Sequence, residues 1–271
     1  MNRKTLVKNI FQKSSYLCIG LDPELTKLPP HLLKEKDPVF EFNKQIIDAT
    51  HDVCVAYKPN TAFYECDGIS GWQSLESTKA YIPSDLFTIA DAKRGDIGNT
   101  SKMYAKAFFD TLQFDALTIA PYMGSDSVQP FLSYEDKWAI VLGLTSNEGS
   151  SDFQKLSLGG SMLYEEVLLK VSHWGTPDNI MFVVGATQAE DFAHIRTLIP
   201  NHFLLVPGIG AQGGDLSAVS KHGLIKDAGL LVNSSRGIIY ASKGTDFAKE
   251  ARKEALKINE VMKLHLDKLD K

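Results

Sequence analysis

Eight short apolar runs recur along the chain, and they restrict its fold more than any other feature. Each run is continuous rather than alternating, which is typical of parallel strands that are covered on both faces. Amphipathic segments compatible with helices separate the runs, for example 38–52 and 97–113. The runs span residues 16–22, 53–59, 86–93, 114–121, 138–146, 180–187, 202–210 and 229–237.

This alternation predicts an α/β fold, and eight strand–helix units over about 250 residues favour a TIM (β/α)8 barrel. A doubly wound open sheet is the alternative, because periodicity does not show whether a sheet closes. The chain of 271 residues has no linker or change in composition, so we expect one catalytic domain over 1–271. Its last part, from Gly244 onward, predicts a long closing helix with a solvated, charged face.

Composition narrows the possible functions. The formal net charge of −4 argues against a surface for nucleic acid or for an anionic membrane. The first 15 residues lack the apolar core of a secretory signal and no stretch is long enough to span a bilayer, so we expect a cytoplasmic protein. Cys18 and Cys54 lie inside apolar runs, which predicts buried, reduced thiols. The histidines lack metal-binding spacing, and we expect neither a metal nor an organic cofactor.

Charged residues gather where the predicted strands end, which is the catalytic face of a barrel. The first strand ends at Asp22, the second at Lys58 and the third at Asp91 and Lys93, with Asp96 just beyond. Because side chains alternate along a strand, Asp91 and Lys93 share a face and can both point to the barrel mouth. A purely structural chain of salt bridges is the alternative, but desolvation can cancel the gain from burying ions.

A glycine-rich turn follows the seventh run. The segment GIGAQG, residues 208–213, matches GxGxxG, but it lies late in the chain and lacks the acidic residue that a dinucleotide fold requires. A phosphate site formed by backbone amides of this turn and of the next helix start, closed by Arg236, fits the position better. A simple tight turn is the alternative. On the same face, 145–161 is the longest expected loop, either a mobile lid or a surface excursion.

These features predict a barrel that binds a phosphate on one side and presents an array of acids and lysines on the other. A lysine held between carboxylates keeps its proton, so Lys93 suits the donation of a proton to a carbanion. Asp91 would repel a carboxylate of the substrate, and the repulsion is relieved as carbon dioxide leaves. The lysine would also stabilise the negative charge that develops on carbon.

At this point the motifs resemble a known family. The segment DAKRGDIGNT contains the DxKxxDI motif of orotidine 5′-phosphate decarboxylase, and GLDPE, YKPNTAFYE, APYMGSDSVQPF, TSN, VVGAT and PGIGAQGGD are similar to its second bacterial subfamily (type 2) in the expected order. The resemblance implies decarboxylation of orotidine 5′-monophosphate to uridine 5′-monophosphate in pyrimidine biosynthesis, without a cofactor. It also implies a homodimer with shared active sites.

The resemblance assigns roles to individual residues. The array would consist of Lys58, Asp91, Lys93 and Asp96, with Lys93 protonating C6. The substrate-binding residues would be Asp22, Thr100, Ser146, Gln212, Ser235 and Arg236. Of these, Asp22 would bind ribose hydroxyls together with Lys58, and Ser146 would contact the pyrimidine. The phosphate would be held by Gln212, Ser235 and Arg236, while Asp96 and Thr100 would reach into the neighbouring subunit's site.

Two other functions remain open from the residues alone. DxKxxD also occurs in sugar-phosphate enzymes of the same superfamily, which form enediolates and generally use magnesium. A phosphate-binding barrel without catalysis, acting as a sensor or scaffold, is the second. Activity on orotidine 5′-monophosphate that survives a chelator separates the proposed enzyme from both.

Overall fold

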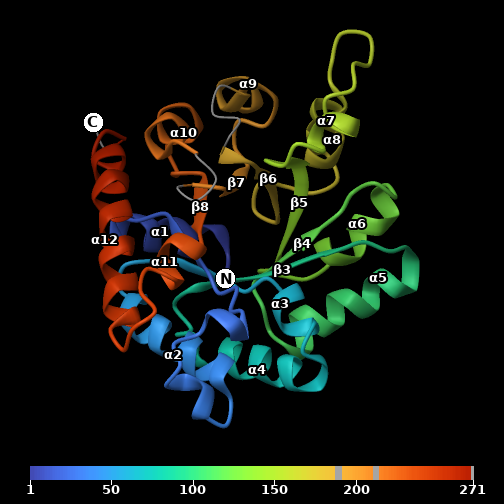
Figure 1. Ribbon diagram of the computed structural model, residues 1–271. Coiled ribbons are helices and arrows are strands. Elements are labelled where there is room, and N and C mark those ends of the chain that lie inside the picture. Colours follow the sequence, from blue (N-terminus) through green and yellow to red (C-terminus); the bar gives the residue numbers. More distant parts are fainter. Residues whose placement is uncertain (187–190, 210–213, 270–271) are drawn as a thin grey trace.

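The computed structural model describes residues 1–186, 191–209 and 214–269. Its eight parallel strands pair in sequence order, and the last strand pairs with the first, so the sheet closes into a barrel with helices around it (Figure 1). The predicted TIM (β/α)8 barrel is therefore confirmed. The open-sheet alternative is excluded because Leu17 and Cys18 of the first strand pair with Val232 and Asn233 of the last.

All eight apolar runs contain a strand. The strands are β1 (Leu17–Gly20), β2 (Ala56–Lys58), β3 (Phe87–Arg94), β4 (Ala116–Ile119), β5 (Trp138–Leu144), β6 (Ile180–Val184), β7 (Phe203–Pro207) and β8 (Leu230–Ser234). The helices are α1 (Arg3–Lys13), α2 (Pro38–Thr50), α3 (Ala62–Glu65), α4 (Gly68–Tyr81), α5 (Gly98–Ala105), α6 (Ser125–Leu132), α7 (Ser150–Phe153), α8 (Leu163–Ser172), α9 (Asp191–Leu198), α10 (Leu216–Gly223), α11 (Arg236–Ile239) and α12 (Phe247–Leu266).

Aromatic side chains fill the interior of the barrel near the start of its strands. Phe87, Trp138 and Phe203 begin β3, β5 and β7, and all three are fully buried. The ring of Trp138 makes edge-on contacts with the other two, each at a centroid distance of 6.0 Å. Contributions from alternate strands are the usual way in which a barrel of this type packs its interior. This end of the barrel is therefore closed, and the opposite end is left for chemistry.

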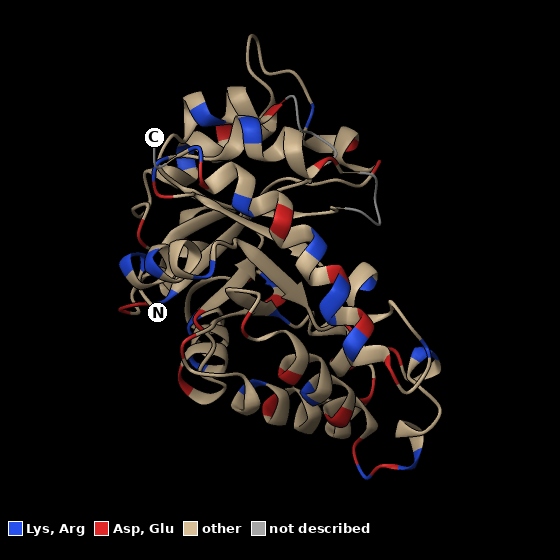
Figure 2. Cartoon of the chain, turned by 90° about the vertical axis from the view of Figure 1, so that its left-hand side faces the viewer, with Lys and Arg blue, Asp and Glu red and all other residues tan. Residues whose placement is uncertain are grey.

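Local sequence signals account for the ends and faces of the helices. Asp37 caps α2 by accepting a hydrogen bond from the N–H of Phe40 at 2.9 Å, and Pro38 occupies its first turn, where no amide hydrogen is needed. Acidic and basic side chains alternate along α12, as predicted (Figure 2). Two of its pairs, Lys253–Glu250 and Lys257–Glu254, form ion pairs on the exposed face.

Three segments differ from the expected pattern. The predicted helix over 97–113 is α5 followed by a π-helical turn, Lys106–Thr111. The expected loop over 145–161 contains the short α7 and an antiparallel bridge between Ser157 and Met162, and it projects beyond the barrel near α8 (Figure 1). The N-terminal helix α1 had no predicted counterpart.

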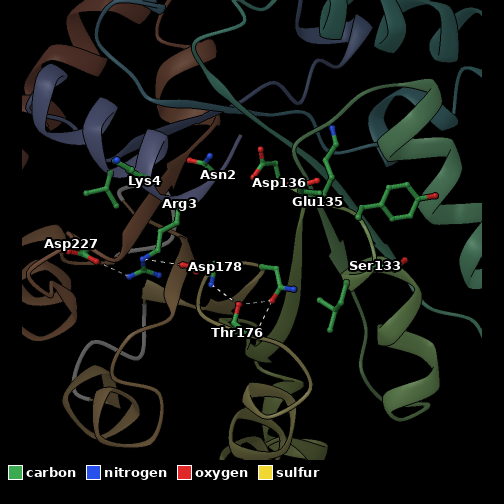
Figure 3. A pocket seen from close by; sticks show the side chains of 14 residues that line it. Asn2, Arg3, Lys4, Ser133, Glu135, Asp136, Thr176, Asp178 and Asp227 are labelled. Atoms are coloured by element: carbon green, nitrogen blue, oxygen red, sulfur yellow. Dashed lines mark hydrogen bonds and ion pairs between the residues drawn. The ribbon is translucent and has the colours of Figure 1, made fainter.

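A cavity of about 740 Å³ lies where α1 meets the loops that precede β5, β6 and β8 (Figure 3). Arg3 extends between the carboxylates of Asp178 and Asp227, at 3.9 and 3.4 Å. Its guanidinium also lies 5.0 Å from the ring centroid of Phe203. Contacts at the N-terminal end of a barrel contribute to its stability, whereas the active site lies at the C-terminal end.

The predicted burial of the cysteines is confirmed for Cys18 and Cys54, whereas Cys66 is exposed. Cys18 and Cys54 are buried and free, and burial raises the pKa of the Cys54 thiol to about 12. A buried thiol with a raised pKa stays protonated, so it packs in the core and does not act as a nucleophile. Within the described part of the chain, no helix has the length and apolar character needed to cross a bilayer.

Candidate active site

Three charged side chains meet at the C-terminal ends of β2 and β3. The Nζ atom of Lys58 lies 2.8 Å from Oδ2 of Asp91, and the Nζ atom of Lys93 lies 2.7 Å from Oδ1 of the same carboxylate. The side chains of Lys58 and Asp91 are buried, whereas that of Lys93 is 49% exposed. The carboxylate therefore joins one ammonium group in the wall of the barrel to another that solvent or a ligand can reach.

The charges hold one another in the ionised state. Burial alone would raise the pKa of Asp91, but Lys58 and Lys93 outweigh it and hold that pKa well below the ordinary value. Burial likewise acts to lower the pKa of Lys58, yet Asp91 and then Asp22 raise it above its ordinary value. At neutral pH the site thus holds a fixed carboxylate and a fixed ammonium group, preorganised to act on charge in a ligand.

The strand is irregular where this array forms. Between β3 and β4, Ala90 pairs with Leu117 and the next pair is Arg94 with Ile119, so β3 advances four residues while β4 advances two. Within the bulge, Lys93 has a φ of 48°, in the left-handed region that residues other than glycine rarely adopt. The alternation of side chains along a strand correctly predicts that Asp91 and Lys93 lie close together. The bulge determines the backbone conformation from which the Lys93 side chain reaches Asp91.

One cavity of about 290 Å³ is lined by two of these three charged residues, Lys58 and Asp91 but not Lys93, and by residues that follow β7 and β8. Asp22, Lys58 and Asp91 line it, and so do Ser235 and Arg236. Asp22 is fixed by the backbone N–H of Asn60, which donates to its Oδ1 at 3.1 Å. The remaining lining residues are Glu24, Asn60, Phe63, Pro207, Gly208, Ile209 and Asn233.

The side of the cavity predicted to bind phosphate is only partly as expected. Arg236 begins α11, is exposed, and makes no ion pair with any residue that the structure describes. Ser235 reaches the cavity because β1 has a glycine beside it: a Cβ on Gly20 would lie 1.6 Å from the Ser235 Oγ. The first backbone amides of α10 were predicted to bind the phosphate. Two of them already donate hydrogen bonds to the side chain of Asp215. Gln212 lies outside the described residues.

The other predicted site residues follow β3 and β5, and neither Asp96 nor Thr100 makes a hydrogen bond or ion pair with Lys58, Asp91 or Lys93 of the same chain. Asp96 accepts a hydrogen bond from the N–H of Ile97 at 2.7 Å, and it forms no ion pair within the described part of this chain. Thr100 is exposed on α5. Ser146 follows β5, packed so closely against Gly185 that a Cβ there would lie 2.7 Å from the Ser146 Cβ.

Sequence reasoning missed two polar side chains at this site. Thr118 lies in β4 and donates a hydrogen bond from Oγ1 to Oδ1 of Asp91 at 3.0 Å. Asn233 lies in β8, and its Oδ1 is buried without a hydrogen-bond partner among the described residues. A polar residue inside an otherwise apolar run was the available signal. In the described ranges, no three His, Cys, Asp or Glu side chains come together to hold a metal ion.

Comparisons with known proteins agree with this geometry. Residues 15–252 match the family described as Orotidine 5′-phosphate decarboxylase / HUMPS family. The chain is 62% identical over 265 residues to the orotidine 5′-phosphate decarboxylase of Flavobacterium johnsoniae, covering 97% of each chain. It is 56% identical over 272 residues to that of Christiangramia forsetii, covering 99% of this chain and 100% of the relative.

Solved structures give the same result. The chain is similar to a putative orotidine-monophosphate decarboxylase from Toxoplasma gondii, with a TM-score of 0.87, 36% identity, and coverage of 97% and 98% of the two chains. It is also similar to the UMP synthase of Leishmania donovani, with a TM-score of 0.81 and 41% identity. This match covers 94% of the present chain and 56% of the longer UMP synthase chain. Its length and these relatives agree with the second subfamily. The chain therefore belongs to the orotidine 5′-phosphate decarboxylase family of enzymes, as its strand-end motifs predict.

Proposed function

We propose that the protein decarboxylates orotidine 5′-monophosphate to uridine 5′-monophosphate in pyrimidine biosynthesis, as one catalytic domain in the cytoplasm and without a cofactor. One observation carries the proposal. A single cavity of about 290 Å³ is lined both by the buried Lys58–Asp91 pair and by Ser235 and Arg236. Such a cavity suits a ligand with a reacting carboxylate at one end and a phosphate at the other.

The proposed chemistry follows from the charges of Lys58, Asp91 and Lys93. The bond from C6 to the substrate carboxylate breaks, the electron pair stays on C6, and carbon dioxide leaves. The Lys93 ammonium group donates its proton to C6 and is then reprotonated by solvent. Its positive charge stabilises the charge that develops on C6, and Asp91 holds the ammonium in place through the contact of 2.7 Å.

The rest of the substrate would be held by the rim of the cavity. Asp22 and Lys58 bind ribose hydroxyls, Ser146 contacts the pyrimidine, and Ser235 and Arg236 bind the phosphate together with Gln212. Forming a vinyl-type carbanion requires a barrier reduction near the upper end of the ~8–23 kcal/mol that enzymes provide. No single ion pair supplies this, so phosphate binding remote from C6 must contribute by positioning the substrate and excluding water.

The proposed enzyme is a homodimer in which Asp96 and Thr100 complete the partner's site. The surface around these residues supports an interface, because four large apolar side chains are exposed there. We call them the apolar rim: Ile97, Met103, Tyr122 and Met123, which are 55%, 52%, 92% and 46% exposed. Ile97 immediately precedes α5, Met103 lies on α5, and Tyr122 and Met123 lie on the loop before α6. The helices α5 and α6 pack side by side (Figure 1). Clustered exposed apolar residues of this kind mark protein interfaces.

A spectrophotometric assay in the presence of EDTA tests the proposed activity. The purified protein is mixed with orotidine 5′-monophosphate and the ultraviolet absorbance of the pyrimidine is followed, with Lys93→Ala as the matched inactive control. We expect turnover by the parent that EDTA does not affect. Binding of the nucleotide without an absorbance change would support a sensor, and turnover of sugar phosphates only with magnesium would support the superfamily's other chemistry.

A further inference from the structure

We propose that Thr118 is a positioning residue for this reaction, whose buried hydroxyl fixes Asp91 and Lys93 relative to each other. Thr118 lies on β4, next to the bulge of β3, and is 1% exposed. It does not line the cavity and does not touch the substrate in the proposed mechanism. The inference rests on the proposed decarboxylation and adds to it the residue that holds the proton donor in place.

The Thr118 hydroxyl makes two hydrogen bonds, one with each of two members of the array, Lys93 and Asp91. Its Oγ1 accepts a hydrogen bond from the backbone N–H of Lys93 at 2.9 Å. It donates its own hydrogen to Oδ1 of Asp91 at 3.0 Å. Because Oδ1 also accepts from the Lys93 ammonium at 2.7 Å, the three residues form a closed ring of hydrogen bonds.

The bulge explains why a side-chain hydroxyl is needed at this position. Regular pairing between β3 and β4 stops at Ala90 and resumes at Arg94. The N–H of Lys93 lies between these points, where β3 has two more residues than β4 and the regular ladder is interrupted. An amide that has lost its partner in the ladder needs another acceptor, and the hydroxyl of Thr118 takes the place of the missing carbonyl.

The same contact holds a strained backbone. Lys93 has a φ of 48°, a conformation that costs on the order of 1 kcal/mol or more for a residue with a side chain. Such a conformation persists only where neighbouring groups hold it, and the hydrogen bond from its own N–H to Thr118 does so directly. Without the hydroxyl, we expect the Lys93 backbone to relax toward an ordinary strand, which moves its ammonium group away from Asp91.

Thr118→Val and Thr118→Ser form a matched pair for the test. Valine keeps the shape and removes both hydrogen bonds, whereas serine keeps the hydroxyl and removes only a methyl group. We expect Thr118→Val to lower kcat by about 100-fold, as for other small misplacements of a catalytic group, with KM and the affinity for uridine 5′-monophosphate nearly unchanged. Thr118→Ser should keep kcat within about fivefold of the parent, which corresponds to about 1 kcal/mol.

The result also separates positioning from a general loss of stability. Both variants are assayed at a temperature at which circular dichroism shows them to be folded. Equal losses of kcat in the two variants, or a loss confined to KM, would overturn the inference. A kcat of Thr118→Val within threefold of that of an active parent would also overturn the inference. That result would not contradict the proposed decarboxylation.

A crystal structure of Thr118→Val tests the inference without any activity. We expect the Lys93 φ to leave the left-handed region, or its Nζ to move beyond hydrogen-bond distance of Asp91. An unchanged array in that structure would refute the positioning role, whether or not the parent enzyme acts on orotidine 5′-monophosphate. Failure of the parent to turn over this nucleotide would refute the proposed function instead.

Discussion

The ammonium group of Lys58 lies 2.8 Å from the carboxylate of Asp91, and both side chains are buried at the floor of the cavity. Lys93 contacts the same carboxylate at 2.7 Å but is half exposed. The two lysines therefore offer a direct comparison, because they differ in burial while sharing one partner. Their burial predicts different effects on stability.

Lys58→Met is expected to lower the free energy of unfolding by about 3 kcal/mol, because it removes a buried partner of a buried charge. Lys93→Met, the matched control, should change the free energy of unfolding by less than about 1 kcal/mol, because Lys93 is half exposed and Asp91 keeps Lys58 as its buried partner. Urea denaturation at pH 7 measures both. Equal losses in the two variants would show that burial does not distinguish the two lysines.

Lys93→Ala is expected to abolish turnover while leaving the fold intact, because the proposed proton donor is removed and the buried Lys58–Asp91 pair remains. The steady-state rate and the circular dichroism spectrum of the variant are the measurements. Activity within tenfold of the parent would remove Lys93 from the role of proton donor.

Arg236→Ala is expected to weaken the reaction of the phosphorylated substrate selectively. The loss of a charge-assisted contact with phosphate should reduce kcat/KM for orotidine 5′-monophosphate by about 10- to 100-fold. Orotidine without its phosphate should react about equally with parent and variant. If the variant loses the same factor on both substrates, the phosphate assignment is wrong.

A mixture of Asp96→Ala and Lys93→Ala subunits tests whether active sites are shared. Each variant alone lacks one group in every site, but a heterodimer combines an intact Lys93 from one subunit with an intact Asp96 from the other. Random exchange should restore about one quarter of the parental activity, given two-fold symmetry. No recovery after subunit exchange has been verified would count against Asp96 crossing to the partner.

The pH dependence of stability should depend on His202, which precedes β7. Both ring nitrogens are buried without a hydrogen-bond partner among the described residues, and the ring packs at 5.4 Å against Phe182. Burial, followed by the charges of Arg3 and Arg196, lowers its pKa from 6.5 to about 4. The folded state therefore binds fewer protons than the unfolded state between these pH values, and stability falls as the pH decreases through that window.

His202→Phe provides the control for this window. A shift from 6.5 to about 4 corresponds to about 3 kcal/mol at 1.36 kcal/mol per pH unit. We expect the parent to lose that much more stability than the variant between pH 7 and pH 4, because carboxylates titrate in both proteins. Parallel curves of unfolding free energy against pH would contradict the assignment.

The fold was predictable because each strand is a continuous apolar run, a pattern that a sheet covered on both faces requires. The charged array was predictable for the same reason, since Asp22, Lys58 and Asp91 mark the ends of three such runs. Closure of the barrel was not visible in the periodicity. It depends on β1 pairing with β8 across the whole length of the chain.

The finer geometry could not be predicted because it arises between segments that are distant in sequence. The left-handed backbone of Lys93 depends on a hydroxyl 25 residues away, and nothing in the local sequence around Lys93 signals it. Likewise, the amides that begin α10 were expected to face a ligand, but Asp215 caps them. A capping aspartate at that position was the signal available in the sequence.

A crystal structure with uridine 5′-monophosphate bound tests the central claim most directly. The array and the phosphate contacts should meet on one ligand in the cavity between Asp91 and Arg236. We predict the phosphate within hydrogen-bond distance of Arg236 and pyrimidine C6 about 3–3.5 Å from Nζ of Lys93. A nucleotide bound elsewhere, or with C6 turned away from Lys93, would contradict the account.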